Sequence, residues 1–145
     1  MMSAQENAAT IRAFNEAYNA RDWDAAIALT APDVEWVSVA TGETFHGPDG
    51  VRQFLDGWAT AFPDSTVETT FVVADEQGGA IEFRGQGTQS GPLRGPAGEI
   101  PPTGKAINVL FAEALEFKQG EIARARLYFD LAGMLGQLGL MPATT

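Results

Sequence analysis

Residues 106–130 read AINVLFAEALEFKQGEIARARLYFD, and this stretch decides the fold. Apolar and polar residues alternate on both sides of Lys118-Gln119-Gly120, a connection too short to join anything but two neighbouring antiparallel strands. We therefore predict a β-hairpin with strands at about residues 106–117 and 121–129. A short helix that ends near Gly136-Gln137-Leu138-Gly139 is predicted to follow it.

One face of the first hairpin strand carries an acid among apolar residues. Side chains alternate between the two faces of a strand, so five residues share this face: Val109, Phe111, Glu113, Leu115 and Phe117. Burial disfavours the ionised form of a carboxyl and raises its pKa towards neutrality, where the acid can donate or accept a proton. We predict Glu113 as the catalytic residue; the alternative is a structural glutamate, paired with an arginine or exposed on the outer face of the sheet.

The N-terminal part of the chain is predicted to be helical. Ser3 and Glu6 form a capping-box pattern, and apolar residues then recur at helical spacing. A second, short helix begins at Asp22 and is predicted to be stopped by Pro32. A strand is predicted to follow at residues 34–40.

The middle of the chain contains one helix and then strands. The amphipathic helix opens at Gly47-Pro48-Asp49-Gly50 and ends at Pro63. Two strands are predicted at residues 66–75 and 80–88. Residues 89–104 are rich in proline and glycine and are predicted to be a long loop, either a rim or lid over a site or plain surface loop. Helices followed by an antiparallel sheet define an α+β class.

The bulk properties limit the size and the partners of the protein. With 145 residues and 45% hydrophobic content, residues 1–145 are predicted to form a single domain. The net charge of −10 makes nucleic acid and anionic membranes unexpected partners, because both attract proteins through lysine and arginine. The chain has no cysteine, which excludes disulfides and thiolate chemistry. The sequence has no signal peptide or membrane helix, so we expect a cytoplasmic protein.

The chain resembles the SnoaL-like polyketide and ester cyclases of the nuclear transport factor 2-like superfamily, whose relatives include ketosteroid isomerase and limonene epoxide hydrolase. The resemblance covers nearly the whole chain, from the helix end Ala17-Tyr18-Asn19-Ala20-Arg21-Asp22 through Ala61-Phe62-Pro63-Asp64 to Gly136-Gln137-Leu138-Gly139. It implies a cone-shaped, curved antiparallel sheet wrapped around the N-terminal helices, an apolar pocket and a homodimer.

The resemblance also shows where this chain departs from its relatives. Leu127 stands where the cyclases and the epoxide hydrolase carry their key aspartate, and leucine cannot transfer a proton. The hydrolase's Asp–Arg–Asp group would map onto Leu127, Arg84 and Gln86, so only the arginine is retained. In ketosteroid isomerase, Glu113 would match the protonated oxyanion-hole aspartate. The isomerase's general base would map onto Trp36, and its phenol donor would map onto Phe14 of the first predicted helix.

The predicted pocket is aromatic. Trp36 is predicted to form a pocket wall that stacks on a flat ligand. Tyr18 either donates a hydrogen bond to a substrate oxygen or is a core residue, and Arg84 and Gln86 alternatively lie on a solvated strand edge. The complete set of predicted substrate-binding residues is Phe14, Tyr18, Trp36, Trp58, Arg84, Gln86, Phe111, Leu127 and Phe129.

The remaining motifs argue against other chemistry. His46 is the only histidine, so we predict no metal site, and its loop position favours a structural or exposed role. Asp130 is predicted to cap the terminal helix. Gly85-Gln86-Gly87 lies within a predicted strand and lacks the following helix of a dinucleotide site, so no cofactor is expected.

We therefore expect a cofactor-independent cyclase or isomerase that acts by acid–base catalysis on a small hydrophobic intermediate of polyketide or terpenoid type. One alternative is an epoxide hydrolase or epoxide-opening cyclase of the limonene epoxide hydrolase type. Another is a ligand-binding module without catalysis, which Leu127 favours.

Overall fold

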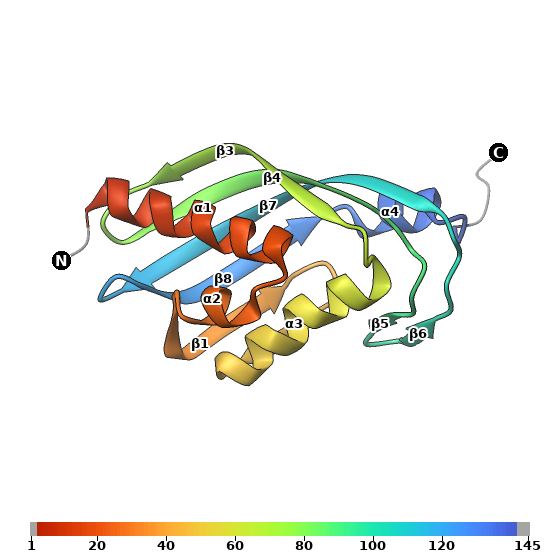
Figure 1. The fold of residues 1–145 in the computed structure, drawn as a ribbon, viewed down its shortest axis with the longest axis horizontal. Helices are drawn as coiled ribbons and strands as arrows, with labels where there is room; N and C mark the ends of the chain where they lie inside the picture. Colours follow the sequence, from red (N-terminus) through yellow and green to blue (C-terminus); the bar gives the residue numbers. More distant parts are fainter. Residues whose placement is uncertain (1–2, 142–145) are drawn as a thin grey trace.

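The computed structural model describes residues 3–141 and contains four helices and eight strands within them. The elements, in chain order, are α1 (Ala4–Ala20), α2 (Trp23–Ile27), β1 (Thr30–Ser38), β2 (Glu43–His46), α3 (Gly47–Ala61), β3 (Thr66–Ala74), β4 (Gly78–Thr88), β5 (Leu93–Gly95), β6 (Gly98–Ile100), β7 (Ala106–Lys118), β8 (Glu121–Phe129) and α4 (Leu131–Gln137). Figure 1 shows α1 and α3 lying across the same face of one large sheet. The predicted α+β class is confirmed.

The large sheet has six strands in the order β2-β1-β8-β7-β4-β3. Neighbouring strands are antiparallel except for β1 and β8, which run parallel. The core lies between the inner face of this sheet and the helices, and it contains apolar residues from α1, α3 and the central strands. The helices therefore enclose the face of β7 that carries Glu113.

The two long helices begin and end where the sequence predicts. Ser3 and Glu6 form the capping box of α1, and Arg21 ends this helix in a left-handed conformation with φ 57°. In α3, a proline occupies the first turn, where its missing N–H is not needed. The buried face of α3 then points towards the sheet.

The prediction for Pro32 is wrong. The helix α2 ends at Ile27, and β1 begins at Thr30, so Pro32 lies inside a strand. The ladder between β1 and β8 pairs Thr30 with Ile122 and resumes only at Glu35. A proline is tolerated there because the bulge between these pairs needs no backbone N–H from it.

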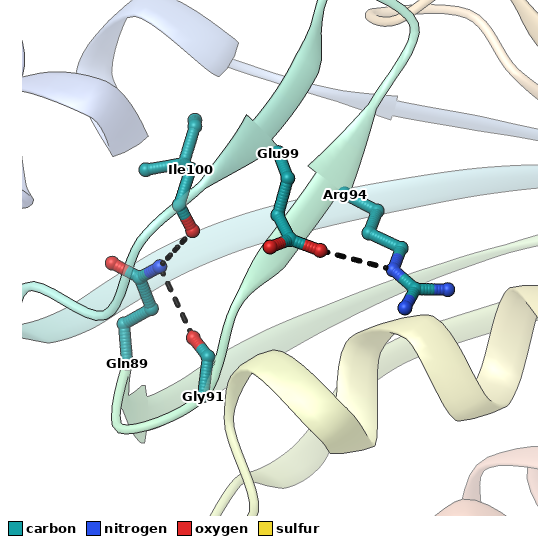
Figure 2. A network of polar contacts seen from close by, with 5 residues as sticks. All are labelled: Gln89, Gly91, Arg94, Glu99 and Ile100. Atoms are coloured by element: carbon teal, nitrogen blue, oxygen red, sulfur yellow. Dashed lines mark hydrogen bonds and ion pairs between the residues drawn. The ribbon is translucent and has the colours of Figure 1, made fainter.

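The segment predicted as a long loop contains a short hairpin formed by β5 and β6. Gln89 is fully buried at its base, where its amide nitrogen donates to the backbone oxygens of Gly91, Ile100 and Pro101. Its amide oxygen accepts from the backbone N–H and the hydroxyl of Thr103. Figure 2 shows Gln89 reaching both ends of this segment. One side chain thus holds the hairpin in place.

The C-terminal hairpin agrees with its prediction. Gln119 and Gly120 both have positive φ, as a two-residue type I′ turn between β7 and β8 requires. Asp130 then caps α4 by accepting a hydrogen bond from the backbone N–H of Gly133, which confirms the predicted capping role. The hairpin therefore fixes the register in which Glu113 lies opposite Leu127.

Candidate functional site

Glu113 is the buried acid of the inner sheet face. Its side chain is 5% exposed, and its cross-strand neighbours are Ile81 on β4 and Leu127 on β8. Phe111 and Leu115, two residues away on the same strand, are also buried. The alternation along β7 therefore places this carboxyl in apolar surroundings, as predicted from the sequence.

Trp36 holds the carboxyl of Glu113. Its indole Nε1 donates to Glu113 Oε2 over 3.1 Å, and Trp36 itself is fully buried. The indole ring stacks on Phe14 of α1, with the centroids 4.4 Å apart, and contacts Phe54 of α3 at a tilt. Within residues 3–141, this indole is the one side-chain donor to the carboxyl.

The environment keeps Glu113 protonated near neutrality. Burial raises the pKa of Glu113 from 4.5 to about 8, and the hydrogen bond from Trp36 opposes this rise because it stabilises the carboxylate. At pH 7 most molecules therefore carry a neutral carboxylic acid here. One carboxyl oxygen accepts from the indole, so the other oxygen can carry the proton of the neutral acid and donate it.

A cavity lies beside this pair, between α1, α3 and the sheet. The space open to the centre of a water molecule is about 60 Å³. This is several times the roughly 10–15 Å³ that one water needs, so the cavity has room for a few water-sized groups as it stands. A polycyclic ligand requires the wall to move.

Six of the predicted substrate-binding residues line the cavity: Phe14, Tyr18, Trp58, Gln86, Phe111 and Leu127. Trp36 and Phe129 are not among the lining residues described. Trp36 lies behind Phe14, and Phe129 packs against Trp58 and Phe111 with ring centroids 5.6 and 5.1 Å away. Glu113 also lies behind the lining. Three lining residues are neighbours of the Trp36–Glu113 pair: Phe14 and Phe54 contact Trp36, and Leu127 lies opposite Glu113.

The prediction that Arg84 faces the pocket is wrong. The buried residues of β4 are Ile81, Phe83 and Gly85, so the alternation turns Arg84 to the outer face of the sheet. There its guanidinium donates to Asn108 Oδ1 over 2.9 Å. Gln86 is exposed and reaches the cavity only at its rim. The hydrolase-type arrangement of these residues is therefore not formed.

Ten further residues line the cavity. They are Asn15, Phe54, Leu55, Phe62, Ser65, Thr66, Val67, Phe83, Gly85 and Ile107. Those from α3 belong to its apolar stripe, and strand alternation marks Phe83 and Gly85 as inward-facing, so sequence patterns were available to find them. Ser65 lies in a connection without periodicity, so no sequence signal pointed to it. Thr66 begins β3 as an exposed residue, so strand alternation does not mark it as inward-facing.

A polar cluster occupies one side of the cavity. The hydroxyl oxygens of Tyr18 and Ser65 are 2.6 Å apart. Arg21 lies over the Tyr18 ring at 4.6 Å and donates to the backbone oxygen and the hydroxyl of Ser65. Burial raises the pKa of Tyr18, while the bond to Ser65 and the charge of Arg21 act in the opposite direction. This phenol is therefore neutral at physiological pH.

Other predicted features lie away from the cavity. His46 is exposed at the start of α3, and its side chain makes no capping hydrogen bond. Within residues 3–141, no three His, Cys, Asp or Glu side chains lie together as metal ligands would. No described helix combines the length and apolar character that crossing a bilayer requires.

The chain is similar to known proteins in sequence and in structure. The model of the SnoaL-like domain family matches residues 11–125. A search of curated protein sequences found no match.

Solved structures share the fold. A proposed SnoaL-like polyketide cyclase from Jannaschia sp. superposes with a TM-score of 0.84 at 20% identity, covering 98% of this chain and 97% of that one. AclR, a proposed hydroxylase from Streptomyces galilaeus, gives 0.81 at 24% identity over 99% and 87% of the two chains. IdmH, a proposed polyketide cyclase from Streptomyces antibioticus, gives 0.75 at 25% identity over 92% and 98%. The architecture is therefore the nuclear transport factor 2-like fold.

Proposed function

The chain belongs to the family of SnoaL-like domains, and from this premise we propose that it is a cyclase or isomerase acting by acid catalysis. Its substrate is a small, largely apolar intermediate of polyketide or terpenoid type that carries a carbonyl group. No cofactor takes part in the proposed reaction. The observation that carries the proposal is the buried carboxyl of Glu113, neutral at pH 7 and held by Trp36.

The chemistry follows from a neutral acid without a neighbouring carboxylate. Leu127 replaces the aspartate of the relatives, so the nucleophilic carbon comes from the enol form of the substrate rather than from deprotonation by the protein. As that carbon attacks a second carbonyl, the carbonyl oxygen takes the proton of Glu113. The enol O–H then returns a proton to the carboxylate. Holding one reactive conformer contributes up to about 7–11 kcal/mol in favourable intramolecular cases.

Phe14 controls access to the acid in this proposal. One side of its ring faces the cavity, and the ring also stacks on Trp36. We propose that movement of this side chain opens the cavity towards Trp36 and the carboxyl that Trp36 holds. The substrate is proposed to bind with Phe14 displaced, which also provides the room that the cavity lacks for a larger ring.

The test uses acyclic 1,3-dicarbonyl compounds that carry a further ketone along the chain. The enol carbon of the 1,3-dicarbonyl attacks this ketone, so the compounds cyclise without an added co-reactant. Purified protein and its Glu113→Gln variant are incubated with a panel of such compounds, and the products are separated and weighed by mass spectrometry. Cyclisation is expected in the wild type and a loss of about 10²-fold or more in rate in the variant, as for removal of a general acid.

The matched control is Glu82→Gln, which neutralises an exposed carboxyl on the adjacent strand β4. This variant is expected to retain the wild-type rate. Full turnover in Glu113→Gln would contradict the proposal. The epoxide hydrolase alternative needs a separate panel of apolar epoxides, whose hydrolysis products gain the mass of one water; the outward position of Arg84 disfavours this alternative.

The second candidate function is a ligand-binding module without catalysis. The cavity is lined by Leu127, which cannot transfer a proton, and Glu113 is not one of its lining residues. This reading predicts that wild type and Glu113→Gln bind the same cyclic ketones and that neither converts the panel.

We also propose that the protein is a homodimer that associates through the outer face of the sheet. Leu110 on β7 and Tyr128 on β8 are 48% and 45% exposed, although both are large and apolar in the main. Ala112 lies beside Tyr128 in the register of these strands. An exposed apolar strip on central strands is typical of a surface that a partner covers.

A further inference from the structure

Two hydroxyl groups form a pair in the wall of the cavity, one from a buried residue and one from a half-buried residue. Tyr18, near the C-terminal end of α1, is 7% exposed, and Ser65 lies in the connection between α3 and β3. Both residues line the cavity, and their oxygens are 2.6 Å apart. Most other lining residues are apolar, so this pair is a polar point in an otherwise apolar wall.

Arg21 holds the residues of the pair, with its guanidinium over the face of the Tyr18 ring. Its guanidinium donates to the backbone oxygens of Pro63 and Ser65 at 3.0 and 2.7 Å and to the Ser65 hydroxyl at 3.3 Å. It also donates to the backbone oxygen of Tyr18 and lies over the tyrosine ring. The two hydroxyls therefore keep their positions without a ligand.

A count of protons leaves one donor over. The pair has two O–H protons, and the bond between the oxygens uses one of them. If Tyr18 donates to Ser65, the serine proton remains; if Ser65 donates, the phenol proton remains. Arg21 brings a further donor and no acceptor. Within residues 3–141, neither hydroxyl has a second acceptor within hydrogen-bond distance.

The other polar lining residues are less suited to this role. The amide nitrogen of Asn15 is engaged with the hydroxyl of Thr69, and Thr66 and Gln86 are exposed at the rim. A ligand with an acceptor oxygen would therefore satisfy the remaining proton of the Tyr18–Ser65 pair inside the cavity. An apolar ligand of the same shape would leave that proton unpaired, and buried unpaired donors are destabilising.

We propose that the Tyr18–Ser65 pair is a recognition site for a carbonyl oxygen of the ligand. The proposal rests on the proposed function, because it names a feature of the ligand bound in the same cavity. It gives the ligand a second oxygen-bearing position, distinct from the group that meets Glu113. Tyr18 and Ser65 act here by orienting the ligand and by selecting ketones over hydrocarbons.

The experiment compares cyclohexanone with methylenecyclohexane, which differ only in the replacement of the carbonyl oxygen by CH₂. Binding to ¹⁵N-labelled protein is followed by amide chemical shifts in the wild type, Tyr18→Phe, Ser65→Ala and the double variant. For each protein we take the ratio of the Kd of the alkene to the Kd of the ketone. The ketone is better hydrated than the alkene, so this ratio is compared between the wild type and the variants, where the difference in hydration cancels. We expect the preference for the ketone, measured by this ratio, to be about three- to tenfold smaller in the double variant than in the wild type.

Each single variant retains one hydroxyl proton, so a smaller loss is expected there. Unchanged binding of the alkene shows that the cavity of the double variant is intact. A second measurement leaves the cavity unchanged. In Tyr128→Phe, Tyr18 is the only tyrosine, so its ¹³Cζ signal is assigned without ambiguity. This chemical shift should respond to the ketone and not to the alkene.

An equal Kd ratio in the wild type and the double variant would overturn the proposal, as would failure of the ketone to bind the wild type. Glu113→Gln separates the two proposals, because it should leave the ketone ratio unchanged. Full turnover in Glu113→Gln together with an intact ketone ratio would remove the proposed catalysis and leave this recognition site standing.

Discussion

At the scale of single residues, the carboxyl of Glu113 dominates the account. An acid in apolar surroundings with one side-chain donor is destabilising when it is ionised, because that single hydrogen bond does not replace its hydration. The protein avoids this by keeping the proton. The same proton is what an acid catalyst needs, so the environment of Glu113 serves the proposed chemistry.

Glu113 is predicted to make stability depend on pH. Its folded pKa is about 8, while the unfolded carboxyl titrates near 4.5. Between these values the folded state binds more protons than the unfolded state, so the stabilisation is complete below pH 4.5 and is lost as pH rises through 8. Urea denaturation from pH 5 to 9 should show a fall of about 4 kcal/mol in the wild type.

Glu113→Gln is the matched control for this measurement, since every other titrating group is retained. The variant should have a free energy of unfolding that is nearly constant over the same pH range. Parallel curves for the two proteins would mean that Glu113 is ionised in the folded state, and the acid role would be lost.

Strand alternation predicts the inward position of Glu113 and the outward position of Arg84. Strand alternation along β7 identifies the buried face from the sequence, because the apolar neighbours mark it. Arg84 was assigned to the pocket by analogy with related enzymes, and its own strand pattern, with Ile81 and Phe83 facing inwards, indicates the opposite face. The pairing of Glu113 with Trp36 joins positions distant in sequence and has no local signal.

At the scale of elements, the segment between β4 and β7 depends on Gln89. Five hydrogen bonds from its side chain connect the residues before β5 with those after β6. No residue from 89 to 104 is among those that line the cavity. Of the two alternatives predicted for this segment, a rim or lid over a site and a plain surface loop, the lining of the cavity favours the second.

Gln89→Leu is predicted to destabilise the protein by about 2 kcal/mol, because a similar-sized apolar side chain removes five hydrogen bonds and leaves the carbonyls of the half-buried Gly91 and Ile100 without this donor. Hydrogen exchange should speed up at the backbone amides of Thr103 and Gly104. Ser90→Leu, an exposed neighbouring position, is the control and should change neither. Wild-type exchange in Gln89→Leu would show that the hairpin is held by other contacts.

The elements themselves were predictable to different degrees. Helix and strand positions around the core follow the apolar periodicity, and the type I′ turn at Gln119–Gly120 fits its short connection. Pro32 was misread because its tolerance depends on a bulge against β8, which is a tertiary feature. The β5–β6 hairpin was missed because three-residue strands are too short for alternation to be visible.

At the scale of the whole molecule, the outer sheet face has no covering layer in a single chain. Leu110 is predicted to lie at the centre of the proposed dimer interface, while Val73 lies on the edge strand β3 and is equally exposed, at 49%. Light scattering should give twice the chain mass of 15.4 kDa for the wild type.

Leu110→Glu places like charges opposite each other across the interface and should give the monomer mass, while Val73→Glu should remain dimeric. A monomeric wild type, or a dimer that survives Leu110→Glu, would contradict the assignment of this face. Sequence analysis could expect the dimer only from the family resemblance, because one strand pattern does not reveal which outer face is covered.

The most direct test of the account is the ionisation of Glu113 in the folded protein. Glutamate carboxyls labelled with ¹³C are titrated by NMR, with Glu113→Gln to assign the signal and Trp36→Phe to remove its hydrogen bond. The account predicts a midpoint near pH 8 in the wild type and a higher one in Trp36→Phe, because the indole stabilises the carboxylate. A wild-type midpoint at or below 4.5 would place an ionised carboxylate at this position and contradict the proposed acid catalysis.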